Sequence, residues 1–137
     1  MDAALQPQAA QARPDPFSAD SRSAMAKMVM NLFDHWQIDS RSQCRLLGLG
    51  PDSRGSLARY RRGEPIAPNE DMVDRAGHLL AIHKNLRILY PENREVAYAW
   101  MTHENQRFAP TPLSFILDNG FEGLACVRRY LDARRGR

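Results

Sequence analysis

The 137-residue sequence has few cysteines and no long apolar run, and each shortage excludes a class of protein. Cys44 and Cys126 are too few and too far apart for a disulfide framework, so we expect both to be small core residues in a reducing compartment. No stretch approaches the roughly 20 apolar residues of a membrane-spanning helix. No basic segment followed by an apolar run marks a secretory signal near the N-terminus. We therefore expect a cytoplasmic protein without membrane contact.

Residues that could perform catalysis are also scarce and poorly spaced. His78 and His83 are five residues apart, which does not stack them on one helix face. His103 and Glu104 have no nucleophile near them in the sequence. No glycine-rich phosphate loop or metal-binding cysteine pair is present. We therefore predict a protein that is not an enzyme and that holds no metal ion or other cofactor.

Lysine is rare as well, so arginine supplies nearly all of the positive charge. Only Lys27 and Lys84 are lysines among the 19 basic residues, which oppose 16 acidic ones. The arginines concentrate between residues 41 and 62 and again between residues 128 and 137. A planar guanidinium group can bind a phosphate or a carboxylate through two parallel hydrogen bonds. The two clusters therefore favour recognition of phosphate or carboxylate groups.

Apolar residues recur at three- and four-residue spacing along most of the chain, which predicts an all-α fold without strands. Residues 1–17 contain three prolines and no periodic apolar face, so we expect them to form a disordered arm. Ser40 and Gln43 fit a capping box at the start of the second helix, and Gly48 suits its left-handed exit. The predicted helices cover residues 18–37, 40–47, 52–62, 69–90, 92–101, 111–120 and 121–134. Trp100 is expected to be a core anchor between the two halves of the chain.

Residues 18–67 are predicted to contain a helix-turn-helix DNA-binding region. A short helix, a glycine-containing turn and an arginine-rich helix form the layout of such a unit. Arginine binds guanine edges or phosphates, and serine can donate a hydrogen bond to either. The same pattern is compatible with a solvent-exposed basic helix that has no partner. The candidate DNA-binding residues are Arg54, Ser56, Arg59, Arg61 and Arg62.

The C-terminal part carries an ordered set of short motifs. They are Asn-Leu-Arg-Ile-Leu-Tyr-Pro at 85–91, Ala-Tyr-Ala-Trp at 97–100, Asn105, Thr-Pro-Leu at 111–113, Gly120 and Val-Arg-Arg-Tyr-Leu at 127–131. Their order and spacing resemble the toxin-binding domain of the Xre/MbcA/ParS antitoxin family. Leu-Leu-Gly at 46–48 and Leu-Ala-Arg-Tyr-Arg-Arg-Gly at 57–63 resemble the helix-turn-helix half of that family. The resemblance covers about residues 24–136 and implies a toxin-binding domain at residues 68–137.

The resemblance also implies a partner and a mode of inhibition. Antitoxins of this family typically accompany a RES-domain toxin, which consumes NAD⁺ or uses it to ADP-ribosylate a target. Their C-terminal segment covers the entrance of the toxin's active site. By this resemblance, the toxin-binding residues are Leu124, Val127, Tyr130, Leu131, Arg134, Arg135 and Arg137.

The expected function is therefore that of an antitoxin in a type II toxin–antitoxin system. It would neutralise its RES-domain toxin, repress its own promoter by binding operator DNA, and form a homodimer within a larger toxin–antitoxin complex. The sequence leaves open whether the toxin degrades NAD⁺ or modifies a protein. A free-standing helix-turn-helix transcription regulator without a toxin is the alternative.

Overall fold

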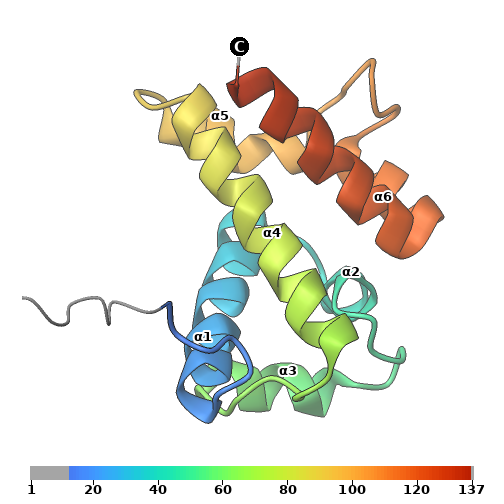
Figure 1. Cartoon of the computed structure of the whole chain (residues 1–137). Coiled ribbons are helices and arrows are strands. Elements are labelled where there is room, and N and C mark those ends of the chain that lie inside the picture. Colours follow the sequence, from blue (N-terminus) through green and yellow to red (C-terminus); the bar gives the residue numbers. More distant parts are fainter. Residues whose placement is uncertain (1–12, 137) are drawn as a thin grey trace, which may run out of the picture.

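The protein is described by a computed structural model that covers residues 13–136, and this part is built from helices alone (Figure 1). The predicted all-α fold class is confirmed for these residues, among which no strand occurs. Most of the predicted N-terminal arm, residues 1–12, lies outside the described residues. The elements are α1 (Ala19–Trp36), α2 (Ser40–Leu46), α3 (Arg54–Arg61), α4 (Glu70–Leu89), α5 (Arg94–Ala99), the 3-10 helix η3 (Trp100–Thr102) and α6 (Pro112–Arg135).

Side-chain caps set the helix starts, and one of them differs from the prediction. The Ser18 hydroxyl accepts the backbone N–H of Ser21 at the start of α1, and α4 begins in the same way at Asn69. The predicted cap of α2 at Ser40 is wrong by one residue. Asp39 caps this helix by accepting the N–H of Ser42 at 2.8 Å. The Gln43 amide donates to the carbonyl oxygen of Ile38 instead of completing a capping box.

Helix α4 runs through the centre of the molecule and contacts both halves of the chain (Figure 1). Its first part lies near α1, α2 and α3, and its second part lies against α5 and α6. The residues on the inward face of α4 are nearly all buried. They form part of one continuous apolar core. The predicted DNA-binding helix α3 and the C-terminal end of α6 lie at opposite ends of the molecule (Figure 1).

The predicted break in the C-terminal helix is confirmed at Gly120. Helix α6 starts at Thr111, which forms a capping box with Ser114. Gly120 then interrupts it with φ 62° and ψ −141°, a conformation that only glycine adopts without strain. The two predicted helices are thus two segments joined at a kink. The second segment, after Gly120, packs along α4.

The predicted role of Trp100 as the anchor between the two halves is wrong. Trp36 at the end of α1 is the buried tryptophan, whereas Trp100 is only half-buried and meets the edge of Phe108 at a centroid distance of 6.4 Å. Phe108 is fully buried and also contacts Phe115 and Tyr130. Phe108, in the loop before α6, is therefore the fully buried member of this C-terminal aromatic cluster.

The expected burial of the two cysteines is confirmed for one of them. Cys44 is buried as predicted, but Cys126 is only half-buried, so it is not the core residue that we expected. In the part of the chain that the structure describes, no helix combines the length and the apolar character needed to span a membrane.

Candidate functional site

Helix α3 presents its basic side chains to solvent. Leu57 and Tyr60 are buried against α1 and α2 and hold the helix in place. Each of the four predicted arginines is exposed, and Ser56 is half-buried. Arg59 donates to the Ser56 hydroxyl at 2.9 Å, a neutral partner that leaves its charge intact. The structure therefore brings all five predicted residues together on one short helix and its C-terminal cap. They are Arg54, Ser56, Arg59, Arg61 and Arg62.

Two of these arginines have carboxylate partners. One guanidinium nitrogen of Arg61 contacts both carboxylate oxygens of Asp34 on α1, at 2.8 and 2.7 Å. Arg62 contacts Glu64 at 3.4 Å. All four side chains are exposed, so these pairs contribute little to stability. They nevertheless reduce the positive charge that α3 presents, which leaves Arg54 and Arg59 as its strongest candidates for a phosphate contact.

The apolar residues assigned to toxin contact are instead part of the protein core. Leu124 is 1% exposed, and Val127 and Leu131 are 0% exposed. They belong to the face of α6 that packs on α4. A partner cannot reach these side chains while α6 is docked, so their assignment as toxin contacts is wrong. The amphipathic pattern of these residues marks the inward side of the helix.

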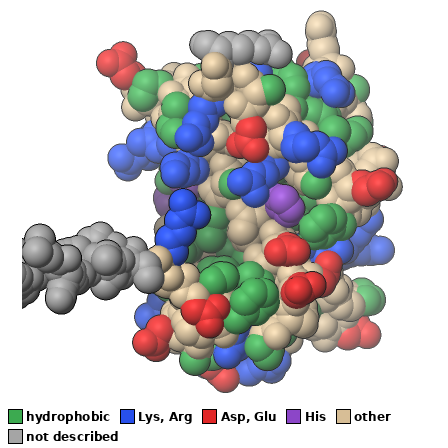
Figure 2. Space-filling view, viewed as in Figure 1, with side chains coloured by type: hydrophobic (Ala, Val, Ile, Leu, Met, Phe, Trp, Pro, Cys, Tyr) green, Lys and Arg blue, Asp and Glu red, His purple; other side chains and the backbone are tan. Residues whose placement is uncertain are grey.

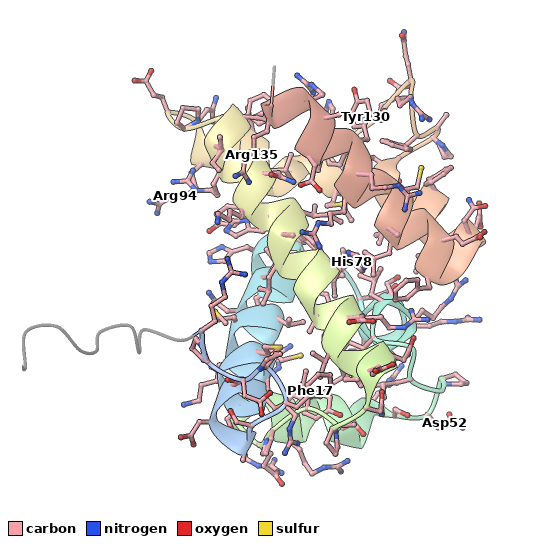
Figure 3. All side chains as sticks on the ribbon, in the orientation of Figure 1. Phe17, Asp52, His78, Arg94, Tyr130 and Arg135 are labelled. Carbon is pink, nitrogen blue, oxygen red and sulfur yellow. The ribbon has the colours of Figure 1, made fainter. Side chains whose placement is uncertain are left out.

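A polar network joins the second segment of α6 to α4. Asn85 is fully buried, and its amide donates to the Asp132 carboxylate at 2.8 Å while its oxygen accepts from Arg135 at 2.9 Å. Arg128 lies 3.3 Å from Asp132 and 3.3 Å from the ring of His78. Figure 3 shows Arg135 and His78 on this face, and Figure 2 shows Lys and Arg side chains over the same region. Burial and the Arg128 charge lower the pKa of His78.

Of the described arginines near the C-terminus, Arg135 belongs to this network and Arg134 packs against a tyrosine. Helix α6 continues to Arg135, and Gly136 caps it. Arg134 lies over the ring of Tyr130, 6.0 Å from its centroid, and the neighbouring Tyr90 and Tyr130 raise the pKa of Arg134. Arg135 therefore makes a contact within the fold as well as being a candidate for toxin binding. Arg137 lies outside the described residues.

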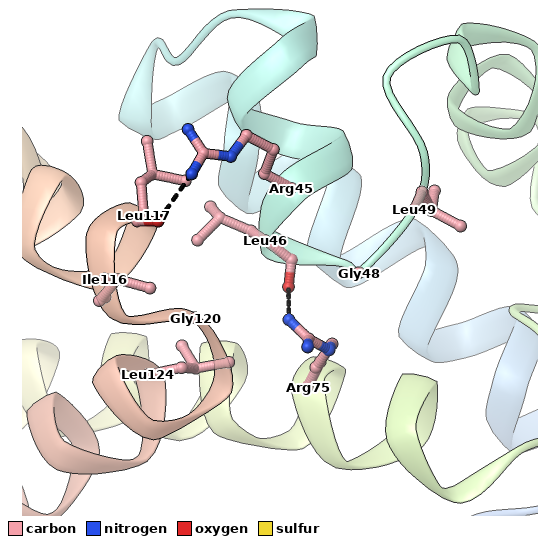
Figure 4. Close-up of a pocket in the computed structure, with 9 residues that line it drawn as sticks. All are labelled: Arg45, Leu46, Gly48, Leu49, Arg75, Ile116, Leu117, Gly120 and Leu124. Atoms are coloured by element: carbon pink, nitrogen blue, oxygen red, sulfur yellow. Dashed lines mark hydrogen bonds between the residues drawn. The ribbon is translucent and has the colours of Figure 1, made fainter.

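Two arginines link the N-terminal helices to the C-terminal ones (Figure 4). Arg45 of α2 donates to the carbonyl oxygen of Leu117, and Arg75 of α4 donates to that of Leu46. Both acceptors lie near the end of a helical segment, where carbonyl groups lack partners within the helix. A hollow of about 260 Å³ lies between them, and Gly48 allows Arg75 to approach, because a Cβ atom there would lie 2.8 Å from its Nε.

Sequence reasoning missed the polar residues that position α6. Asn85 and Asp132 are 47 residues apart, so no local spacing could have paired them. Asn85 occupies an inward position of α4 in the predicted helical pattern, and a buried amide on such a face needs a partner. Within residues 13–136, no group of three or more His, Cys, Asp or Glu residues could hold a metal ion.

Comparison with known proteins gives two findings. Residues 85–137 match the family described as the antitoxin Xre/MbcA/ParS C-terminal toxin-binding domain. The chain is also 31% identical over 122 residues to a protein of Sinorhizobium fredii described as uncharacterized protein y4oB. This alignment covers 87% of the chain and 92% of that relative. The family match includes α5, η3, α6 and the end of α4, so it contains the whole Asn85–Asp132–Arg135 contact.

Proposed function

The chain belongs to the Xre/MbcA/ParS antitoxin family, and on this premise we propose that it is the antitoxin of a RES-domain toxin. The toxin would degrade NAD⁺ or transfer its ADP-ribose group to a target. The observation that carries the proposal is the match of residues 85–137 to the toxin-binding domain of the family. The antitoxin would act in the cytoplasm, where both NAD⁺ and the operator DNA are present.

Inhibition would use the C-terminal end of α6. Tyr130, Arg134 and Arg135 lie at the end of this helix, and Arg135 is exposed although one of its nitrogens bonds to Asn85. Guanidinium groups suit a cleft that binds a pyrophosphate, because they can bind the carboxylates and polar groups around its rim. Arg137 would extend this contact. The buried Leu124, Val127 and Leu131 would act indirectly, by holding the helix at its angle on α4.

Helix α3 would bind the operator and so repress the promoter of the toxin–antitoxin pair. Support comes from its exposed arginines and from its position at the opposite end of the molecule from the C-terminus, so toxin and DNA could bind together (Figure 1). A homodimer within the toxin–antitoxin complex would present two such helices to the half-sites of a palindrome. Residues 18–67 would then be the DNA-binding region and residues 68–137 the toxin-binding domain.

The test of toxin neutralisation uses the full chain and the purified RES-domain protein that the proposal expects to be encoded beside it. We expect the chain to rescue growth of cells that express this protein and to stop its consumption of NAD⁺ in a mixed assay. Failure of both rescue and inhibition, with a folded antitoxin, would contradict the proposal. If such a protein still bound its own promoter, the free-standing transcription regulator would be the better description.

The test of DNA binding compares Arg59→Ala with the unchanged chain in a gel-shift titration on its own promoter. We expect weaker binding and a salt dependence reduced by about one phosphate contact. Arg22→Ala on α1 is the matched control, because Arg22 donates to the carbonyl oxygen of Ile66 and is not on α3. An equal loss of DNA affinity in both variants would contradict the assignment of α3 to the DNA interface. Unchanged neutralisation by Arg59→Ala would place the two activities in separate parts of the chain.

A further inference from the structure

An apolar groove opens beside α5, in the part of the chain that matches the toxin-binding domain. Its volume is about 300 Å³. The end of α4 supplies Tyr90, α5 supplies Val96 and Ala99, and η3 supplies Trp100. The loop that follows places the polar side chains of His103 and Glu104 at its edge. We call this feature the α5 groove.

The side chains of the α5 groove are of the kind that carry binding energy in protein interfaces. Val96 is 40% exposed, one of the few large hydrophobic residues in the described chain with so much surface in water. Trp100 and Tyr90 are half-buried, so each combines a fixed ring with an accessible face. Tryptophan and tyrosine dominate interface hot spots because they bury a large area at a small cost in conformational entropy.

The α5 groove also lies near the C-terminal end of α6 (Figure 1). Tyr90 lines the groove, and its interaction with Arg134 raises the pKa of that arginine. Arg134 in turn lies over the ring of Tyr130. A partner that contacts the end of α6 would therefore lie close to the groove. The leucine and valine face of α6 is buried and cannot provide this apolar contact.

We propose that the α5 groove is the apolar docking site of the toxin, which inserts an aromatic or branched aliphatic side chain beside Trp100 and Val96. This inference rests on the proposed function. A basic toxin residue next to the inserted side chain would face Glu104 at the polar edge. Docking at the groove would supply most of the affinity, and the end of α6 would supply the inhibition.

The test measures the dissociation constant of the full chain for the purified neighbouring RES-domain protein by calorimetry. Val96→Arg places a long charged side chain in the mouth of the groove and keeps a good helix former on α5. We expect the dissociation constant to rise about tenfold or more. Met28→Arg is the matched control, because Met28 is 49% exposed on α1, outside residues 85–137. We expect this control to bind within about twofold of the unchanged chain.

A second variant and a spectroscopic readout keep the test decisive. Ala99→Arg blocks the groove from an exposed position and should weaken binding as Val96→Arg does. The chain has two tryptophans, so 5-fluorotryptophan labelling gives two ¹⁹F resonances, assigned with Trp100→Phe. The toxin should shift the Trp100 resonance and leave that of the buried Trp36 in place.

Two results distinguish this inference from the proposed function. Normal toxin binding by folded Val96→Arg and Ala99→Arg, with an unshifted Trp100 resonance, would contradict the assignment of the α5 groove as the docking site. The proposed antitoxin role would remain intact. No binding of the RES-domain protein by the unchanged chain would overturn the proposed function and, with it, the occupant that we assign to the groove.

Discussion

Arg45 donates to the carbonyl oxygen of Leu117 at 2.7 Å, although the two residues are 72 positions apart. The bond joins α2, in the predicted helix-turn-helix region, to the first segment of α6 (Figure 4). Leu117 lies just before the break at Gly120, so its carbonyl group is among those that lose their partner in the helix. A positive charge at this point also complements the negative end of the helical segment.

Replacing Arg45 with alanine should lower the free energy of unfolding by about 1 kcal/mol, because a charge-assisted hydrogen bond at a partly exposed site is lost. The melting temperature, followed by circular dichroism, should fall by about 2–4 °C. Arg41→Ala is the matched control, since it removes the same charge from an exposed position on α2. An equal loss in the two variants would show that charge, and not the contact with Leu117, is responsible.

Asp34 neutralises Arg61 through two short contacts, which predicts that Asp34→Asn strengthens DNA binding. Release of this arginine should raise the affinity for the promoter about threefold and increase the salt slope by about one phosphate contact. Asp20→Asn, in the first turn of the same helix, removes an equal charge. If both variants bind more tightly by the same factor, the effect belongs to net charge. A loss of affinity in Asp34→Asn would mean that Asp34 orients Arg61 for its contact.

Arg135→Ala should destabilise the fold, in contrast to what the sequence suggests for an exposed C-terminal arginine. The substitution leaves the buried Asn85 oxygen without its 2.9 Å donor, a loss of about 1–2 kcal/mol. Arg129→Ala, at an exposed position of the same helix, should change the melting temperature by much less. Equal melting temperatures for Arg135→Ala and the unchanged chain would show that the Asn85 contact contributes nothing in solution.

The ring of Tyr98 is stacked on two histidines and predicts a pH-dependent stability. The ring centroid of His35 lies 4.1 Å from that of Tyr98, and the ring centroid of His83 lies 5.2 Å from it. Both imidazole rings are nearly parallel to the tyrosine ring. The Nδ1 atom of His83 is buried, and no partner for it is found among the described residues. Burial lowers the pKa of His83, and the charge of Arg87 and the neighbouring His35 lower it further.

Because the folded state binds a proton at His83 less readily than the unfolded state does, stability is greatest above the ordinary histidine pKa of about 6.5. It should fall as the pH drops from 6.5 toward the lowered pKa of the folded protein. We expect the melting temperature to decrease between pH 7.5 and 5.5, and to decrease less in His83→Gln. His103→Gln, on an exposed loop, should retain the full pH dependence. An identical pH profile for His83→Gln and the unchanged chain would exclude His83 as its source.

The predictions from sequence succeeded where the cause is local and failed where it is a long-range contact. Gly48, Thr111 and Gly120 mark their helix boundaries because turn and capping preferences depend on neighbouring residues alone. The apolar face of α6 was also identified, but its periodicity does not say whether the host protein or a partner covers it. Leu131 was therefore assigned to the toxin although it packs on α4.

The candidate site depends more on such long-range contacts than the fold does. The pairing of Asn85 with Arg135 joins residues 50 positions apart, and the Arg61–Asp34 contact joins residues 27 apart. Composition predicted a basic α3 surface, but it could not show which of its charges have partners. A charge count treats Arg61 and Arg59 alike, whereas their contacts distinguish them.

Gly120 and Gly77 provide a matched pair of substitutions in which only the backbone conformation differs. A Cβ atom would meet nothing within 4 Å at either position, so neither Gly→Ala change creates a steric clash. Gly120 has φ 62° and ψ −141°, which costs a residue with a Cβ about 1–3 kcal/mol. Gly77 lies within α4, where alanine is the better helix former by about 1 kcal/mol. Gly120→Ala should therefore lower the free energy of unfolding and Gly77→Ala should raise it.

Urea unfolding of the two variants, followed by circular dichroism, measures both changes against the same unfolded chain. Any general effect of adding a methyl group in the unfolded state is common to the two, so the difference between them reports the strain at Gly120 together with the gain in helix propensity at Gly77. We expect this difference to be about 2–4 kcal/mol. A Gly120→Ala variant as stable as Gly77→Ala would mean that α6 can run straight through residue 120. In that case the contact between Arg45 and the carbonyl oxygen of Leu117 would also be lost, because that carbonyl would accept from within the helix.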